Sequence, residues 1–202
     1  EIDDRAYDIQ VSAAGTSFRM KDADNKEYEF STKLIGAHNV ENVAAAIAVA
    51  NKLGISMEKL QIQVRQIKPV PHRLQLIKRS GLLIIDDAYN SNPSGAKAAL
   101  DTLSMFDGVK ILMTPGMIEL GSRQYECNKI FGTQAAAVCD YVVLVGEEQT
   151  RPIYDGLLEA GFSKERIKVV DDLKDGFGFV EHIDGGDKEK ILLLENDLPD
   201  NY

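Results

Sequence analysis

The segment DDAYNSNPSG carries the densest group of residues that could take part in chemistry. Asp86 and Asp87 end an apolar run, and Tyr89 and Asn90 follow closely. Carboxylates placed in this way can accept hydrogen bonds from ribose hydroxyls or from an ammonium group. Asn92, which precedes a proline, is explained by capping a helix. Because capping does not explain the other polar residues, we predict a binding site here.

Two further loops follow apolar runs. MTPGMIELG contains Glu119 and Met117, whose side chain we expect to be exposed. A rigid turn and a binding loop explain this segment equally well, so both interpretations stay open. In VGEEQTR, Glu147 and Glu148 lie near a helix N-terminus, where the helix dipole favours acidic residues in any case. We predict no site in that third loop.

Polar residues also surround the start of a predicted helix in GAHNVEN. Asn39 is the expected N-cap, and Asn42 lies on the same side of the helix start. Two carboxamides there could read the donor and acceptor edge of a purine. His38 by itself is weak evidence for catalysis. With three histidines in the chain and no carboxylates at ligand spacing, we predict no metal site.

Several phosphate and nucleophile motifs are absent from the sequence. It contains no GxxxxGK[ST] phosphate loop, no GxGxxG and no GxSxG. If the chain uses a nucleotide, we expect the phosphates to be held by residues outside it.

The elements that must position these segments fall into two groups. Residues 1–70 contain three short strand-like runs, predicted as an antiparallel meander, and then two helices. The two prolines of KPVPHR predict a boundary, which gives domains at 1–70 and 71–202. In the second domain helices alternate with about five strands that are apolar on both faces, which predicts a doubly wound parallel α/β sheet. The strands are LLIID, VKILM, DYVVLVG, RIKVVD and KILLLEN.

Composition narrows the kinds of partner. The chain has 202 residues, with 23 basic against 32 acidic ones and a net charge of −9, so it offers no basic field for nucleic acid or an anionic membrane. It has neither a membrane-length apolar run nor a signal-like start, and we expect a cytoplasmic protein. Cys127 and Cys139 are expected to lie in one helix as buried free thiols. The start at Glu1, within strand-like sequence, suggests a piece of a longer protein.

Four of these segments resemble motifs of the Mur ligase family. GAHNVENVAAAIAVA is similar to the family's G-x-H-N-x-x-N helix, and HRLQ at 72–75 to its hinge arginine motif. DDAYNSNPSG is similar to the D-D-x-Y-N-x-N-P signature of the D-Ala-D-Ala-adding branch, and GMIELG to that branch's G-D-M-x-E-L-G loop. The resemblance extends over nearly the whole chain.

The resemblance implies the following organisation and reaction. Residues 1–70 would end a central ATPase domain, and 71–202 would form a Rossmann-like C-terminal domain. A preceding part would hold the UDP-sugar domain, the phosphate loop and the Mg²⁺ ligands. The enzyme, expected to be a monomer, would use ATP to activate a UDP-MurNAc-tripeptide as an acyl phosphate. D-Ala-D-Ala would then attack, in a step of peptidoglycan precursor synthesis.

The family's functional residues can be carried over by position. Asn39 and Asn42 would face adenine, and Arg73 and Asp87 would be the catalytic residues on the ribose and phosphate side of ATP. The amino acceptor would contact the loops after the first two strands of the second domain, which lie side by side if these strands are neighbours, as sequential strands often are. The acceptor residues would be Tyr89, Asn90, Asn92, Met117 and Glu119.

Two departures from the branch's motifs keep further functions open. TPGM stands where the branch has LGDM, and LLLENDLPDNY lacks the branch's KGSR-like segment. These departures allow a divergent ligase with another acceptor. A folylpolyglutamate-type amide ligase and a non-catalytic nucleotide-binding module stay open as well.

Overall fold

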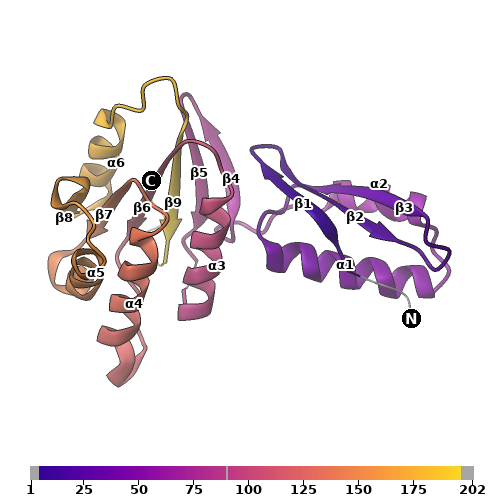
Figure 1. Ribbon diagram of the computed structural model, residues 1–202, viewed down its shortest axis with the longest axis horizontal. Helices are drawn as coiled ribbons and strands as arrows, with labels where there is room; N and C mark the ends of the chain where they lie inside the picture. Colours follow the sequence, from indigo (N-terminus) through magenta and orange to yellow (C-terminus); the bar gives the residue numbers. More distant parts are fainter. Residues whose placement is uncertain (1–4, 90, 197–202) are drawn as a thin grey trace. The chain divides into compact units, whose positions relative to one another are not determined.

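The structure is a computed structural model that describes residues 5–89 and 91–196. It divides into two compact units, one ending at Leu76 and the other beginning at Ile77 (Figure 1). The division lies a few residues after the predicted boundary at 70–71. Within the described ranges, no helix combines the length and the apolar character needed to cross a membrane.

The first unit is an antiparallel sheet packed against two helices. The sheet has the order β1-β2-β3, and the stacked rings of Phe18 and Phe30, with centroids 5.5 Å apart, pair across β2 and β3. Both rings are buried beneath apolar residues of the helices, including Val43 and Leu60. The predicted meander and helices are therefore confirmed. The elements are β1 (Tyr7–Ser12), β2 (Gly15–Lys21), β3 (Glu27–Thr32), α1 (Ala37–Lys52) and α2 (Met57–Gln66).

The second unit is built on a six-stranded sheet with the order β4-β5-β9-β6-β7-β8. The pairs β5–β9, β9–β6, β6–β7 and β7–β8 are all parallel, so the predicted α/β fold is confirmed. Its strands are β4 (Gln75–Arg79), β5 (Leu82–Asp87), β6 (Val109–Thr114), β7 (Tyr141–Val145), β8 (Ile167–Val170) and β9 (Lys190–Glu195). Its α-helices are α3 (Pro93–Ser104), α4 (Gln124–Ala136), α5 (Glu147–Glu159) and α6 (Leu173–His182), with short 3₁₀ turns at Gly121–Arg123 and Lys164–Arg166.

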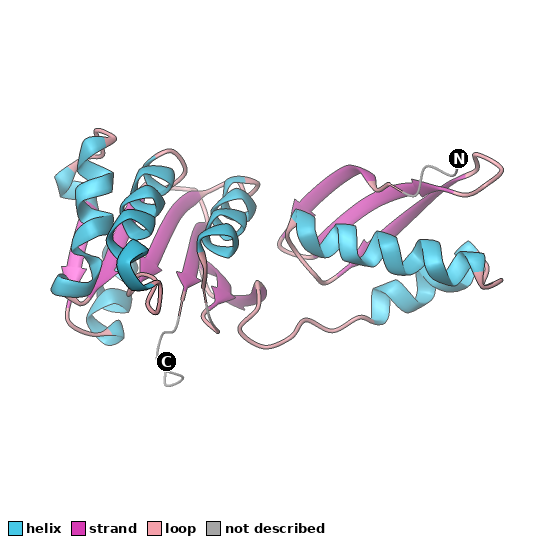
Figure 2. Cartoon of the chain, turned by 90° about the horizontal axis from the view of Figure 1, so that it is seen from below, coloured by secondary structure: helices cyan, strands magenta, loops and turns pink. Residues whose placement is uncertain are grey.

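Helices cover both faces of this sheet (Figures 1 and 2). Ile84, Met113 and Leu194 belong to the core on the face covered by α6, which contributes Leu173 and Val180. Side chains alternate between faces along a strand, so the intervening residues point to the opposite face, where α3, α4 and α5 lie. The alternation decides which side of the sheet each residue at a strand end occupies.

The sheet has one strand more than the sequence indicated, and the condition that its first two predicted strands are neighbours is not met. β4 was not predicted, because its five residues are half-buried or exposed and follow a proline-rich segment. The first two predicted strands, β5 and β6, are not neighbours, since β9 lies between them. β9 is buried along nearly its whole length, and a strand buried on both faces is most stable between two partners.

The cysteine prediction also needs correction. α4 ends at Ala136, so Cys139 lies beyond the helix that holds Cys127. Both thiols are free, as expected, but only Cys139 is fully buried.

Candidate functional site

Two carboxylates meet at the carboxyl ends of adjacent strands. Asp87 of β5 is paired in register with Glu195 of β9. Glu195 is 1% exposed, whereas Asp87 is partly exposed. Oε1 of Glu195 accepts a hydrogen bond from Ser91 Oγ at 2.5 Å. Oε2 is buried without a hydrogen-bond partner among the described residues. Because Oε1 is bound to Ser91, Oε2 is the oxygen of Glu195 that is available for an interaction with Asp87.

The electrostatics of this pair favour a bound proton. Burial raises the pKa of Glu195 well above its usual value, and the negative charge of Asp87 raises it further. The hydrogen bond from Ser91 acts in the opposite direction, but it is the weaker influence. Both burial and the charge of Asp87 favour the protonated form of Glu195 over the ionised form.

Asn196, immediately after β9, joins the two loops that were predicted to form a site. Its Oδ1 accepts from the backbone N–H of Ser91 at 3.0 Å, and its Nδ2 donates to the carbonyl of Gly116. Its own N–H donates to the Asp87 carbonyl at 3.3 Å. The loops after β5 and β6 are thus linked through the end of β9, although their strands are not adjacent.

In the first loop, the predicted residues differ in whether their side chains are free to contact a ligand. The Tyr89 side chain is 61% exposed. Asn92 caps α3 as expected, because its Oδ1 accepts from the N–H groups of Ser94 and Gly95 at 3.1 and 2.9 Å. Asp86 is buried on the sheet face opposite Asp87. Asn90 lies outside the described residues.

In the second loop the expected exposure of Met117 is wrong. Met117 is 0% exposed, because Asn128 of α4 binds both its N–H and its carbonyl at 2.8 Å. The Gln149 side chain donates to the same carbonyl at 3.2 Å. Glu119, in contrast, is exposed and has a left-handed backbone, with φ of 61°. Of the two predicted residues in this loop, only Glu119 presents its side chain to solvent.

The remaining predicted residues belong to the first unit. The expected N-cap role of Asn39 is wrong, because α1 begins at Ala37 and the Asn39 side chain donates back to the Ile35 carbonyl at 2.8 Å. Asn42, one turn further on, is exposed. Arg73 is also exposed and lies in the segment between α2 and β4. Within the second unit, the structure brings Asp87 together with the two loops that follow β5 and β6.

Ser91, Asn128, Glu195 and Asn196 were not predicted as site residues. For Glu195 and Asn196 the sequence did hold a signal, since they end the apolar run KILLL just as Asp86 and Asp87 end LLII. Applying the strand-end rule to this last run would have found them. Ser91 and Asn128 hold the site through hydrogen bonds to Glu195 and Met117, which no local sequence pattern predicts.

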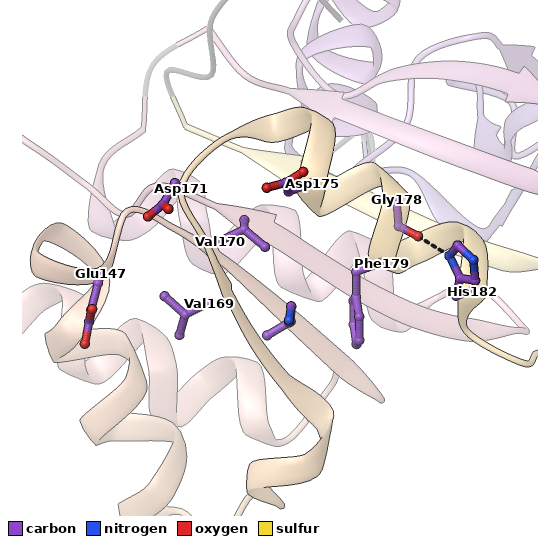
Figure 3. Close-up of a pocket in the computed structure, with 9 residues that line it drawn as sticks. Glu147, Val169, Val170, Asp171, Asp175, Gly178, Phe179 and His182 are labelled. Carbon is purple, nitrogen blue, oxygen red and sulfur yellow. Dashed lines mark hydrogen bonds between the residues drawn. The ribbon is translucent and has the colours of Figure 1, made fainter.

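A separate pocket of about 730 Å³ lies between β8 and α6 (Figure 3). Val169 and Phe179 line it together with the carboxylates of Asp171 and Asp175. His182 is at its rim, with Nδ1 2.7 Å from the Gly178 carbonyl. No residue of the predicted site lines this pocket. In the described ranges, no group of three or more His, Cys, Asp or Glu side chains could hold a metal ion.

Comparison with known proteins adds sequence relatives and structural neighbours. The chain is 34% identical to the UDP-N-acetylmuramoyl-tripeptide–D-alanyl-D-alanine ligase of Bacillus subtilis (strain 168) over 177 residues. The aligned region covers 86% of this chain and 38% of that protein. The chain is 32% identical over 163 residues to the UDP-N-acetylmuramoylalanine–D-glutamate ligase of Prochlorococcus marinus (strain MIT 9515), covering 80% of this chain and 32% of that protein.

A crystal structure of MurF from Acinetobacter baumannii superposes with a TM-score of 0.75 at 25% identity, covering 95% of this chain and 41% of that one. The chain therefore spans less than half the length of the relatives it matches. Residues 72–190 match the Mur ligase glutamate ligase domain, and residues 1–50 match the Mur ligase middle domain. The chain belongs to the Mur ligase family.

Proposed function

We propose that this chain is part of an ATP-dependent ligase that adds D-Ala-D-Ala to a UDP-MurNAc-tripeptide in peptidoglycan precursor synthesis. The observation that carries the proposal is the junction at the end of β9, where Asn196 links the DDAYNSNP loop to the GMIELG loop. These are the two segments that resemble the D-Ala-D-Ala-adding branch. The similarity to the B. subtilis ligase supports the same assignment.

The proposed reaction has two steps. The γ-phosphoryl group of ATP passes to the substrate carboxylate, which gives an acyl phosphate and ADP. The amine of the acceptor then attacks the acyl carbon, so that an amide bond forms, the C–O bond to phosphate breaks, and the amine releases a proton. We assign this reaction to a cytoplasmic, monomeric enzyme whose middle and C-terminal domains include residues 1–70 and 71–202.

Within this enzyme the first unit and Asp87 would contact ATP. Asn39 and Asn42 offer carboxamides to adenine, and Arg73 offers a guanidinium to the phosphates. Asp87 offers a carboxylate to the ribose hydroxyls. The described residues do not fit a Mg²⁺ site, since they hold no cluster of ligands, and the sequence has no phosphate loop.

The acceptor would contact the loops of the second unit. Glu119 and Tyr89 are exposed, so they can meet the ammonium and carboxylate ends of a zwitterionic dipeptide. Asn90 stays in this group on the basis of the sequence. Asn92 and Met117 support the loops instead, because the Asn92 side chain caps α3 and Met117 is buried.

The test is a phosphate-release assay on the longer protein that contains this chain. We expect release that requires ATP, the UDP-MurNAc-tripeptide and D-Ala-D-Ala together. Equal release with D-glutamate and a UDP-MurNAc-alanine substrate, or with L-glutamate and a folate, would assign the protein to another amide ligase. The 202-residue chain by itself should not hydrolyse ATP, because phosphoryl transfer needs a phosphate loop to hold the β- and γ-phosphates.

A further inference from the structure

We propose that Glu195 is a positioning residue that holds a proton and donates it, through Oε2, to the carboxylate of Asp87. At the same time Oε1 accepts from Ser91, so the neutral acid would connect the end of β5 with the loop that follows it. Asp87 would then keep the orientation needed to accept hydrogen bonds from a ligand. The consequence for ligase activity rests on the proposed function, whereas the shared proton itself does not.

The geometry requires a donor at this place. Glu195 is 1% exposed, and its Oε2 has no hydrogen-bond partner among the described residues. The neighbouring Asp87 is in register with it and has only acceptor oxygens when ionised. Two charged carboxylates in contact inside a protein repel each other, and a buried acceptor without a donor is costly. One proton between Oε2 and Asp87 removes both penalties.

The charge that acts on the pKa of Glu195 is that of Asp87, and the described residues of β6 and α3 that lie beside this strand end are neutral. On the β6 side of β9, the residues beside this strand end are Met113 and Thr114, which do not titrate. α3 presents Ala96, Ala99 and Leu100 as buried residues, and Ser91 is neutral. Asp86, the other acid of β5, points to the opposite face. Asp87 is therefore the charged group that acts on Glu195, and its charge reinforces the effect of burial.

Asn196 and Ser91 connect the Glu195–Asp87 pair to the loop after β5. Ser91 donates to Glu195 with its hydroxyl and to Asn196 with its backbone N–H. Ionisation of Glu195 would leave Asp87 facing a second negative charge, and the ends of β5 and β9 would separate. The loop that carries Tyr89 would move with Ser91, because the two residues are close in sequence.

The first test uses the 202-residue chain and no substrate. Carbon-13 NMR would follow the side-chain carboxyls of glutamate and aspartate during a pH titration, with Glu195→Gln and Asp87→Asn variants to assign the signals. We expect the Glu195 carboxyl to titrate well above the other glutamates. Titration of Glu195 together with the exposed glutamates would overturn the proposal.

Thermal melts provide the second measurement. A carboxyl whose pKa is raised on folding stabilises the protein fully below its unfolded value of about 4.5, and this stabilisation is lost as the pH rises through the folded value. Glutamine can donate to Asp87 and accept from Ser91 without titrating, so Glu195→Gln should remove this loss. The exposed Glu181→Gln variant is the matched control and should follow the original chain. Parallel pH curves for Glu195→Gln and the original chain would contradict the shared proton.

The third measurement addresses the proposed function. In the longer protein, we expect kcat/KM for ATP to fall at high pH, because Glu195 then ionises. Glu195→Gln should keep kcat/KM for ATP near the original value and remove this fall. Glu195→Ala should lower it about tenfold or more at every pH, since Asp87 loses a charged hydrogen bond. If the NMR and melting results hold but both variants behave like the original enzyme, the positioning role is wrong although the proton is shared. If no ligase activity is found at all while the NMR result holds, the proposed function fails and the shared proton stands.

Discussion

Asn128 binds both backbone polar groups of Met117, accepting from its N–H and donating to its carbonyl, each at 2.8 Å. One buried carboxamide on α4 thereby fixes the middle of the loop after β6. The same amide group also donates to the Gln124 carbonyl at 2.9 Å, which secures the start of the helix. These hydrogen bonds hold the loop at the buried Met117, and the next acidic residue, Glu119, is exposed to solvent.

We expect Asn128→Ala to lower the free energy of unfolding by about 2–4 kcal/mol, because buried backbone groups of Met117 and Gln124 lose their partners. Urea denaturation of the 202-residue chain measures this change. The control is Glu126→Ala on an exposed position of the same helix, which should change stability by less than about 0.5 kcal/mol. Equal effects of the two variants would show that Asn128 does not hold the loop.

The contact between α4 and α5 predicts the outcome of a glycine substitution. A Cβ on Gly156 would lie 2.0 Å from the Lys129 carbonyl oxygen, so Gly156→Ala requires the helix backbones to separate. We expect a loss of more than about 2 kcal/mol from this overpacking, measured by thermal melts. Gly178→Ala in α6 is the control, since nothing lies within 4 Å of its Cβ, and it should be neutral or slightly stabilising. A tolerated Gly156→Ala would mean that the helices are less closely packed.

Cysteine reactivity separates the two thiols. Burial raises the pKa of Cys139, and the adjacent Asp140 carboxylate raises it further, so the reactive thiolate is scarce at neutral pH. We expect iodoacetamide to label the partly exposed Cys127 in the native chain, and Cys139 only after unfolding in urea. Mass spectrometry of the labelled peptides distinguishes them. Early labelling of Cys139 under native conditions would contradict its burial.

A substitution of Arg73 tests the proposal that the first unit binds ATP. Arg73→Ala in the longer protein should lower kcat/KM for ATP about tenfold or more, because a guanidinium–phosphate contact is lost. Its melting temperature should not change, since the side chain is exposed. Arg79→Ala, exposed on β4, should leave the kinetics unchanged. An unstable Arg73→Ala variant with normal ATP kinetics would make the role of Arg73 structural.

Glu119 tests the acceptor site. Glu119→Gln keeps the size of the side chain but removes the charge that would bind the acceptor's ammonium group. It should raise KM for D-Ala-D-Ala and leave KM for ATP near its original value. Glu148→Gln, exposed at the start of α5, is the matched control. A change in KM for ATP alone, or in neither KM, would place the acceptor elsewhere.

Local features of the sequence were sufficient for part of this protein. Strands that are apolar on both faces predicted the parallel sheet, and the Asn92–Pro93 pair predicted the start of α3, because these signals act over a few residues. The aspartates at the end of β5 could be placed at the binding edge of the sheet for the same reason. Their chemistry depends on residue type and strand end, both of which are visible in the sequence.

Tertiary structure alone decided the order of the strands and the partners of the site residues. β9 lies between β5 and β6 because its apolar run is most stable with neighbours on both sides, and this arrangement brings Glu195 to Ser91 across 104 positions of sequence. Met117 is buried because a helix that follows it supplies Asn128. Such pairings depend on which distant segments exclude water from each other, and no local pattern contains that information.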